Sequence, residues 1–136
     1  MPLFGAVATI CLAPAASAAD VVIRAEGLRN ANGNLLVAIC REDTFLGAAC
    51  AIRGAAPAAA ETVRLADVPP GEYAVQAFHD ENANGRLDRT ARGRPAEGMG
   101  FSRDAPMRFG PPDYADAAIV MPETGGRLTV RMRYFQ

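Results

Sequence analysis

The sequence contains no lysine, only one histidine and only three cysteines among its 136 residues. One histidine and so few thiols provide too few soft ligands for a zinc or iron–sulfur site, and they leave little room for a Ser-His-Asp array. All 14 basic residues are arginines, which we attribute to codon bias in a GC-rich genome rather than to phosphate recognition. With 15 acidic residues the formal net charge is −1, so the chain lacks the basic footprint of a nucleic-acid binder. We therefore expect no nucleic-acid partner.

Long hydrophobic runs are also missing, since the most apolar stretch, residues 3–13, is too short to span a bilayer and ends at a proline. It lies within the uncharged segment 1–19, which closes on a run of small residues. Such a segment is typical of a secretory signal peptide, although it lacks a basic residue near its start. We predict cleavage near Ala18 or Ala19, a mature domain over 20–136, and a secreted or periplasmic location in a bacterium with no membrane span. A buried N-terminal helix is the alternative.

The cysteines take different roles under this prediction. Cys11 lies in the leader, and the isoleucine before it is too bulky for a lipoprotein signal. Cys40 and Cys50 remain as the two thiols of an exported chain, ten positions apart, and we expect them to form a disulfide. Closing such a loop is worth about 2–3 kcal/mol in the chain-entropy model. A redox pair is the alternative, but redox-active cysteines usually have C-x-x-C spacing, which is much closer than the ten positions found here.

Alternating apolar and polar residues predict short strands over 21–26, 35–39, 61–65, 72–78, 115–121 and 127–134. Turn residues at Asn32-Gly33 and at 124–126 predict that the first two strands and the last two form hairpins. The alanine-rich segment 48–60 favours a helical turn and an irregular loop equally. The pattern as a whole predicts an all-β fold, a single antiparallel β-sandwich of about seven strands, immunoglobulin-like or transthyretin-like. One long loop region covers 80–113, and loops of that length usually carry function or a bound ion.

The start of this loop resembles a calcium-binding loop. Oxygen donors stand at positions 1, 3, 5, 7 and 9, with Gly85 at position 6 for the sharp turn. Alternate residues of a tightly coiled loop point their oxygens at one centre, and Leu87 is expected to anchor the loop in the core. The candidate metal ligands are Asp80, Asn82, Asn84, the backbone carbonyl of Arg86, and Asp88.

The match is incomplete because position 12 is Ala91 rather than a bidentate glutamate. Glu97 is the first candidate to replace it, followed by Asp104 and Asp113. With few carboxylates and several nearby arginines, any calcium site should be weak. An Asx-rich turn whose side chains cap their own backbone amides needs no ion and is an equal alternative.

The single histidine, His79, ends the fourth predicted strand. A histidine at a strand end is usually a structural side chain with satisfied hydrogen bonds. With Asp80 or Glu97 beside it, His79 would also suit a general base, but no nucleophile is marked in the sequence.

Three motifs resemble one family. They run from His79 to Asp88, from Gly93 to Ser102 and from Phe109 to Ala118, and they resemble the patterns HDENGNGxLD, GxPxEGxGFSN and GPPxFxDA of the domain-of-unknown-function 2141 family of small exported bacterial proteins. The resemblance implies a signal peptide and a single β-sandwich, and it brings no established activity and no catalytic residues. The chain departs from the pattern at Ala83, where the family has Gly, and at Arg103-Asp104, where Asn-Asn is usual.

These observations favour a non-enzymatic exported module that binds an envelope protein or a small ligand through the loops between Asp80 and Tyr114. In this hypothesis a weakly bound calcium ion rigidifies these loops. The alternative is a small periplasmic hydrolase or isomerase that uses His79 with a nearby carboxylate. It predicts that His79 lies in an open pocket within hydrogen-bond reach of that carboxylate. A third hypothesis is a structural part of an envelope assembly that pairs through an exposed strand edge.

Overall fold

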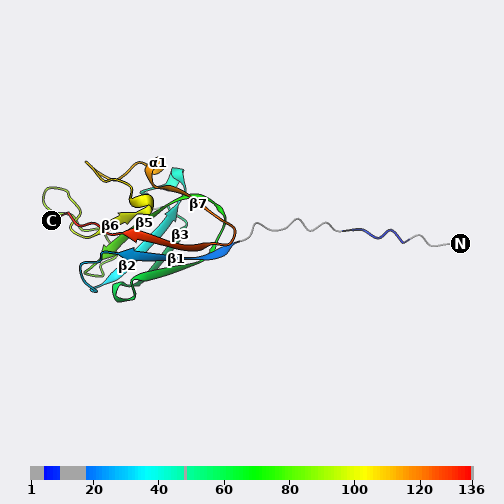
Figure 1. Ribbon diagram of the computed structural model, residues 1–136, viewed down its shortest axis with the longest axis horizontal. Helices are drawn as coiled ribbons and strands as arrows, with labels where there is room; N and C mark the ends of the chain where they lie inside the picture. Colours follow the sequence, from blue (N-terminus) through cyan, green and yellow to red (C-terminus); the bar gives the residue numbers. More distant parts are fainter. Residues whose placement is uncertain (1–4, 10–17, 48, 136) are drawn as a thin grey trace.

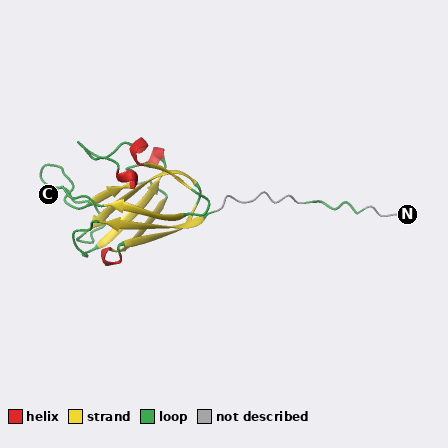
Figure 2. Ribbon diagram, viewed as in Figure 1, coloured by secondary structure: helices red, strands yellow, loops and turns green. Residues whose placement is uncertain are grey.

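The computed structural model describes residues 5–9, 18–47 and 49–135, and this part of the chain is built almost entirely from strands (Figure 2). The only α-helix in it is the single turn α1, Tyr114–Ala117, and 3-10 turns lie at Glu42–Thr44, Ala58–Ala60 and Ser102–Asp104. The strands are β1 (Ala19–Glu26), β2 (Asn34–Cys40), β3 (Ile52–Pro57), β4 (Thr62–Val68), β5 (Gly71–Asp80), β6 (Met99–Phe101), β7 (Ala118–Met121) and β8 (Gly126–Arg131).

The strands form two stacked sheets (Figure 1). One has three strands in the order β4-β1-β8, and the other has five, in the order β3-β2-β5-β6, with β7 on the same edge of β5 as β6 but at its other end. Neighbouring strands are antiparallel except β1 and β8, which run parallel. The predicted all-β sandwich is therefore confirmed, with eight strands in the described part of the chain.

Both predicted hairpins are wrong. β1 pairs with β4 and β8, whereas β2 pairs with β3 and β5 in the other sheet. In the same way β7 pairs with β5 and β8 pairs with β1. The turn residues do reverse the chain, but each reversal carries it from one sheet to the other. Consecutive strands that each have one apolar face can bury those faces against each other across the core instead of lying edge to edge.

The segment 48–60, predicted as a helical turn or a loop, contains strand β3 followed by the 3-10 turn at Ala58–Ala60. Alanine and glycine have low strand propensity, so the sequence does not show β3. Gly54 is explained by packing, because a Cβ added there would lie 2.9 Å from Cγ1 of Val63 in the opposite sheet. The long loop over 80–113 also contains one short strand that the pattern missed, β6.

The main core lies between the inner faces of the two sheets. In β2 the side chains of Leu35, Val37 and Ile39 are buried there, while Leu36 and Ala38 point to the outer face and are half-buried. β5 follows the same alternation, with His79 facing inward and Phe78 outward. The buried residues of this core are Val21, Ile23, Ala25, Leu35, Val37, Ile39, Val63, Leu65, Val68, Tyr73, Val75, Ala77, Met121, Val130 and Met132.

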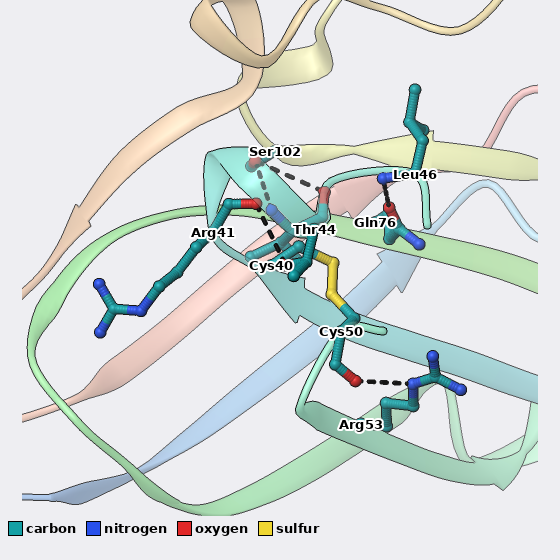
Figure 3. The surroundings of a disulfide bond; sticks show 9 residues. Cys40, Arg41, Thr44, Leu46, Cys50, Arg53, Gln76 and Ser102 are labelled. Carbon is teal, nitrogen blue, oxygen red and sulfur yellow. Dashed lines mark hydrogen bonds between the residues drawn. A yellow bond between two sulfur atoms is a disulfide. The ribbon is translucent and has the colours of Figure 1, made fainter. Parts of the chain in front are cut away.

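The predicted disulfide is present and joins Cys40, at the end of β2, to Cys50 (Figure 3). The two Cα atoms are 5.2 Å apart and both side chains are buried. The loop that this bond closes crosses toward the outer face of the five-stranded sheet. There the backbone N–H of Leu46 donates to Oε1 of Gln76 at 3.3 Å. The disulfide thus holds a loop against that face.

A second, smaller cluster covers one end of the outer face. It consists of buried Ala74, Phe101, Ala105 and Ala117, and the ring of Phe45 packs edge-on against Phe101 and Tyr114. Buried Ser102 secures it: its hydroxyl accepts a hydrogen bond from Val75 N–H at 2.9 Å and donates to the carbonyl of Ala117. Phe101 and Tyr114 therefore belong to a core and do not line a binding surface.

The predicted signal peptide, residues 1–19, falls largely outside the described residues, which include only 5–9 and 18–19 of it. Residues 5–9 are exposed and carry no regular structure. Within the described ranges, no helix has the length and apolar character needed to cross a membrane.

Candidate functional site

The loop that follows β5 is organised around Asp80. This carboxylate is 1% exposed, and its two oxygens accept the backbone N–H groups of Asn84 at 3.2 Å and Gly85 at 2.8 Å. Asp80 thus closes the turn in the way expected of an Asx residue, because its side chain replaces backbone acceptors that the loop lacks.

The other predicted ligands at the start of the loop converge on Asp88. Nδ2 of Asn82 donates to Asp88 at 2.6 Å, and Nδ2 of Asn84 donates to both carboxylate oxygens at 2.9 Å. These hydrogen bonds, from Asn82 first and then Asn84, lower the pKa of the Asp88 carboxyl. The N–H of Arg86 donates to Oδ1 of Asn84 at 2.9 Å.

Glu97, predicted to replace the missing glutamate of the calcium loop, does reach it. Its carboxylate is 5% exposed and accepts the backbone N–H groups of Glu81 at 3.1 Å and Asp88 at 3.4 Å, so it joins the two ends of the loop. Burial raises the pKa of Glu97, and the negative charges of Asp88 and Asp80 raise it further. The reserve candidates lie elsewhere: Asp104 pairs with Arg133, and Asp113 precedes α1.

The loop gathers oxygen atoms but does not form a metal site from carboxylates alone. Among the described residues, no three His, Cys, Asp or Glu side chains are arranged to hold a metal ion. An ion would need the amide oxygens of Asn82 and Asn84, whose NH₂ groups now face Asp88, and the carbonyl of Arg86. Leu87 is half-buried and borders the groove described below, so the prediction that it anchors the loop in the core is wrong.

His79 is fully buried on the inner face and both ring nitrogens are bonded. Nε2 lies 2.7 Å from the carbonyl oxygen of Asn32, and Nδ1 lies 2.8 Å from the hydroxyl of Tyr134. A carbonyl can only accept, so Nε2 carries the proton and Nδ1 accepts from the tyrosine in the neutral ring. Consecutive residues of a strand face opposite ways, which takes Asp80 out of reach. The nearest carboxylate contact of His79 in the structure is Oε1 of Glu81, at 3.9 Å.

Tyr134 connects this histidine to the surface. The Arg29 guanidinium lies 4.6 Å from the centre of the Tyr134 ring and bonds Glu81 at 2.6 Å. Burial alone would raise the pKa of Glu81, but hydrogen bonds from Arg29 and Asn30 outweigh it and lower the pKa. Gly98 leaves room for the tyrosine, since a Cβ there would overlap its ring. This network fastens the C-terminal segment to the end of the sandwich.

A groove that the sequence did not predict lies on the outer face of the five-stranded sheet. It has a volume of about 1110 Å³. Outward side chains of β2, β5 and β6 form its floor, among them Leu36, Phe78 and Met99. Three loops form its walls: the disulfide loop at 46–47, the loop after β5 at 85–95, and the segment 107–111. The fully exposed ring of Phe109 belongs to the third wall.

Arginines surround this apolar floor. Among the described residues, the groove is lined by Arg53, Arg89, Arg94 and Arg108 and by no aspartate or glutamate. The sequence did not mark them as one set, because they come from three segments and the chain is rich in arginine throughout. The alternation of β2 and β5 could have pointed to the floor, since both strands carry apolar residues on both faces.

The motifs quoted above thus occupy defined places. The first forms the Asp80 loop, the second supplies Glu97 and the close-packed Gly98-Met99-Gly100-Phe101, and the third leads into α1 and β7. The family model "Uncharacterized protein conserved in bacteria (DUF2141)" matches residues 23–129. The chain belongs to the DUF2141 family. The DUF2141 match covers the sandwich from β1 into β8 together with the groove and its walls. No curated protein and no solved structure matches the chain.

Proposed function

We propose that this DUF2141 protein is a non-enzymatic exported module of the cell envelope that binds a partner or a small ligand in the groove on its outer face. The observation that carries the proposal is the groove itself. Soluble domains rarely leave a contiguous apolar surface exposed without a use, and concave apolar sites with a few polar groups are the usual form of a ligand site. Two of its wall residues, Leu46 and Phe109, are large apolar side chains exposed to solvent.

The surroundings of His79 support a non-enzymatic role. The alternative hydrolase or isomerase needs this side chain in an open pocket beside a carboxylate. Here it is fully buried and both nitrogens have partners that are not carboxylates. A general base in this position would have to give up a hydrogen bond and reach solvent through the core.

The binding proposal is tested with the neutral fluorescent probe N-phenyl-1-naphthylamine. We expect its emission to rise in the presence of the full chain. Leu36→Glu, which places a charge on the groove floor, should weaken probe binding at least about tenfold. Val120→Glu is the matched control, because Val120 is 78% exposed on β7 and does not line the groove. No emission change with the folded protein, or equal loss in both variants, would refute the groove as a binding site.

We propose further that the loop over 80–97 binds calcium weakly and that the ion stiffens one wall of the groove. Support comes from Glu97, which enters the loop from outside its sequence and sets a third carboxylate near Asp80 and Asp88. A bound cation relieves the repulsion among these carboxylates. A 180° rotation of the side-chain amides of Asn82 and Asn84 would turn their oxygens toward the ion.

Thermal unfolding of the full chain in millimolar calcium and in chelator tests this proposal. An ion that binds only the folded state should raise the midpoint temperature of unfolding by several degrees. Asp88→Asn should remove the shift with little effect on the ion-free midpoint, because the carboxylate of Asp88 accepts only from the exposed side chains of Asn82 and Asn84. Glu123→Gln, at the exposed β7–β8 turn, should keep the shift. Coincident curves with and without calcium would leave the Asx turn as the explanation of the loop.

A further inference from the structure

We propose that the ligand of the groove is a long-chain carboxylate, with its acyl chain on the floor formed by Leu36, Phe78 and Met99 and its carboxylate bound by Arg89, Arg94 or Arg108. This inference rests on the proposed function, because it names the chemical class that the groove accepts.

Charge complementarity is the first argument. The whole chain carries a formal charge of −1, yet the groove is lined by four arginines and, within the described residues, by no acidic side chain. Among the described residues, three of the ten arginines outside the groove pair with a carboxylate: Arg29 with Glu81, Arg64 with Asp20 and Arg133 with Asp104.

The rim arginines differ from these pairs. In the part of the chain that the structure describes, Arg89, Arg94 and Arg108 have no carboxylate partner, and Arg89 bonds only the carbonyl of Gly93, at 3.1 Å. Guanidinium groups are suited to binding a carboxylate through two parallel hydrogen bonds. These three guanidinium groups are therefore available to bind the carboxylate of a ligand.

The construction of the floor is the second argument. β2 lies between β3 and β5, and β5 lies between β2 and the pair β6 and β7, so the backbone groups of both strands are used within the sheet. The floor presents side chains only. A peptide laid across it would lose water from its own N–H and C=O groups without gaining partners, whereas an acyl chain has no such groups to satisfy.

Size is consistent with this ligand. The volume of about 1110 Å³ is slightly above the range of roughly 300–1,000 Å³ for small-molecule sites, so the groove has room for a long acyl chain. Each methylene that reaches the floor should therefore add to affinity. Full burial of a methylene corresponds to about a fourfold gain, so we expect a two- to fourfold gain per carbon until the chain outgrows the floor.

The test displaces N-phenyl-1-naphthylamine from the full chain with three amphiphiles that share a twelve-carbon tail, each below its micelle concentration. These are dodecanoate, the cation dodecyltrimethylammonium and the neutral dodecyl maltoside. We expect dodecanoate to displace the probe at a concentration at least about tenfold lower than the other two. Shorter alkyl carboxylates should be progressively weaker, by the factor given above.

Variants locate the headgroup. Arg89→Gln, Arg94→Gln and Arg108→Gln combined in one variant should abolish the preference for dodecanoate while leaving binding of the neutral probe within about twofold. Arg127→Gln, an exposed arginine on β8 in the other sheet, is the matched control and should change neither.

The outcomes separate the two proposals. If the neutral probe does not bind, the proposed function itself fails. If the probe binds but the three amphiphiles displace it equally, or if the cation is preferred, the carboxylate inference is overturned and the binding module stands. A preference for dodecanoate that survives the triple arginine variant also overturns the assignment of the rim. Stronger displacement by an acidic apolar peptide, or loss of probe binding as the protein dimerises at high concentration, would replace the fatty carboxylate with a peptide or a second copy of the chain.

Discussion

The two faces of the five-stranded sheet are made from the same strands but follow different rules. On the inner face, the apolar side chains of β2 and β5 are fully buried and the polar exception, His79, has a partner at each nitrogen. On the outer face, Leu36, Phe78 and Met99 remain half-buried beside three arginines, Arg89, Arg94 and Arg108, that have no carboxylate partner among the described residues. A face that serves stability satisfies its own groups, whereas a face that serves binding leaves both apolar surface and charge available.

Backbone conformation separates the two faces in the same way. Several residues other than glycine adopt the left-handed region in the loops that cover the outer face, namely Leu46, Ala83, Arg103 and Asp104. Such conformations cost of order 1–2 kcal/mol for a residue with a side chain. The other two such residues in the described part of the chain are Glu61, in the turn before β4, and Asp67, in β4 of the other sheet.

The largest expected effect comes from adjacent leucines on opposite faces. Leu35→Ala should lower the free energy of unfolding by about 2–5 kcal/mol, because it empties a fully buried site in the core. Leu36→Ala should cost about 1 kcal/mol or less, since its site is half-exposed, but should weaken binding of the neutral probe several-fold. Denaturant unfolding of both variants measures the loss of stability, and titration with the probe measures the loss of binding. Equal losses of stability would show that the outer face is as much a core as the inner one.

The next effect tests the hydrogen bonds of the inner face. His79→Phe keeps an aromatic ring but leaves the carbonyl of Asn32 without its donor and the hydroxyl of Tyr134 without its acceptor, which should lower the free energy of unfolding by about 1–3 kcal/mol. On the outer face of the same strand, Gln76→Met removes the hydrogen bond that the N–H of Leu46 donates. This should lower the free energy of unfolding by at most about 1 kcal/mol. Chemical denaturation of the two proteins gives both values. If His79→Phe left the free energy of unfolding unchanged, the hydrogen bonds of His79 would not stabilise the fold.

The smallest effect concerns the loop beside the groove. Ala83 has φ of 56°, so Ala83→Gly should raise the free energy of unfolding by about 0.5–1 kcal/mol as the strain is relieved. Ala91→Gly, in the same loop but without a positive φ, should instead be neutral or destabilising by up to about 1 kcal/mol. Thermal and denaturant unfolding of the pair would reveal whether strain at Ala83 limits stability. Equal responses would indicate that the loop does not contribute to the folding transition.

Local patterns predicted the strands that alternate clearly, as in β1 and β8, and the cysteine pair. They failed at β3, where alanine and Gly54 hide a strand that exists because the opposite sheet packs against it. They also failed at both hairpins, because a turn motif specifies a reversal but not the sheet to which the next strand belongs. At the site, spacing identified Asp80, Asn82, Asn84 and Asp88, and Glu97 was found from the missing twelfth ligand. The groove could not be found, because its walls come from three separate segments.

The sequence by itself determined the all-β class, the family, the disulfide pair and the residues of the acidic loop, because each depends on residue types at short spacing. Only the tertiary structure decided which strands share a sheet and that His79 is enclosed. It also decided that Leu36, Phe78 and Met99 share one surface with three arginines that lack a carboxylate partner in the described part of the chain. The physical reason is that a strand's alternation records which residues share a face but not what covers that face. Coverage depends on loops distant in sequence, and here they leave part of one face open.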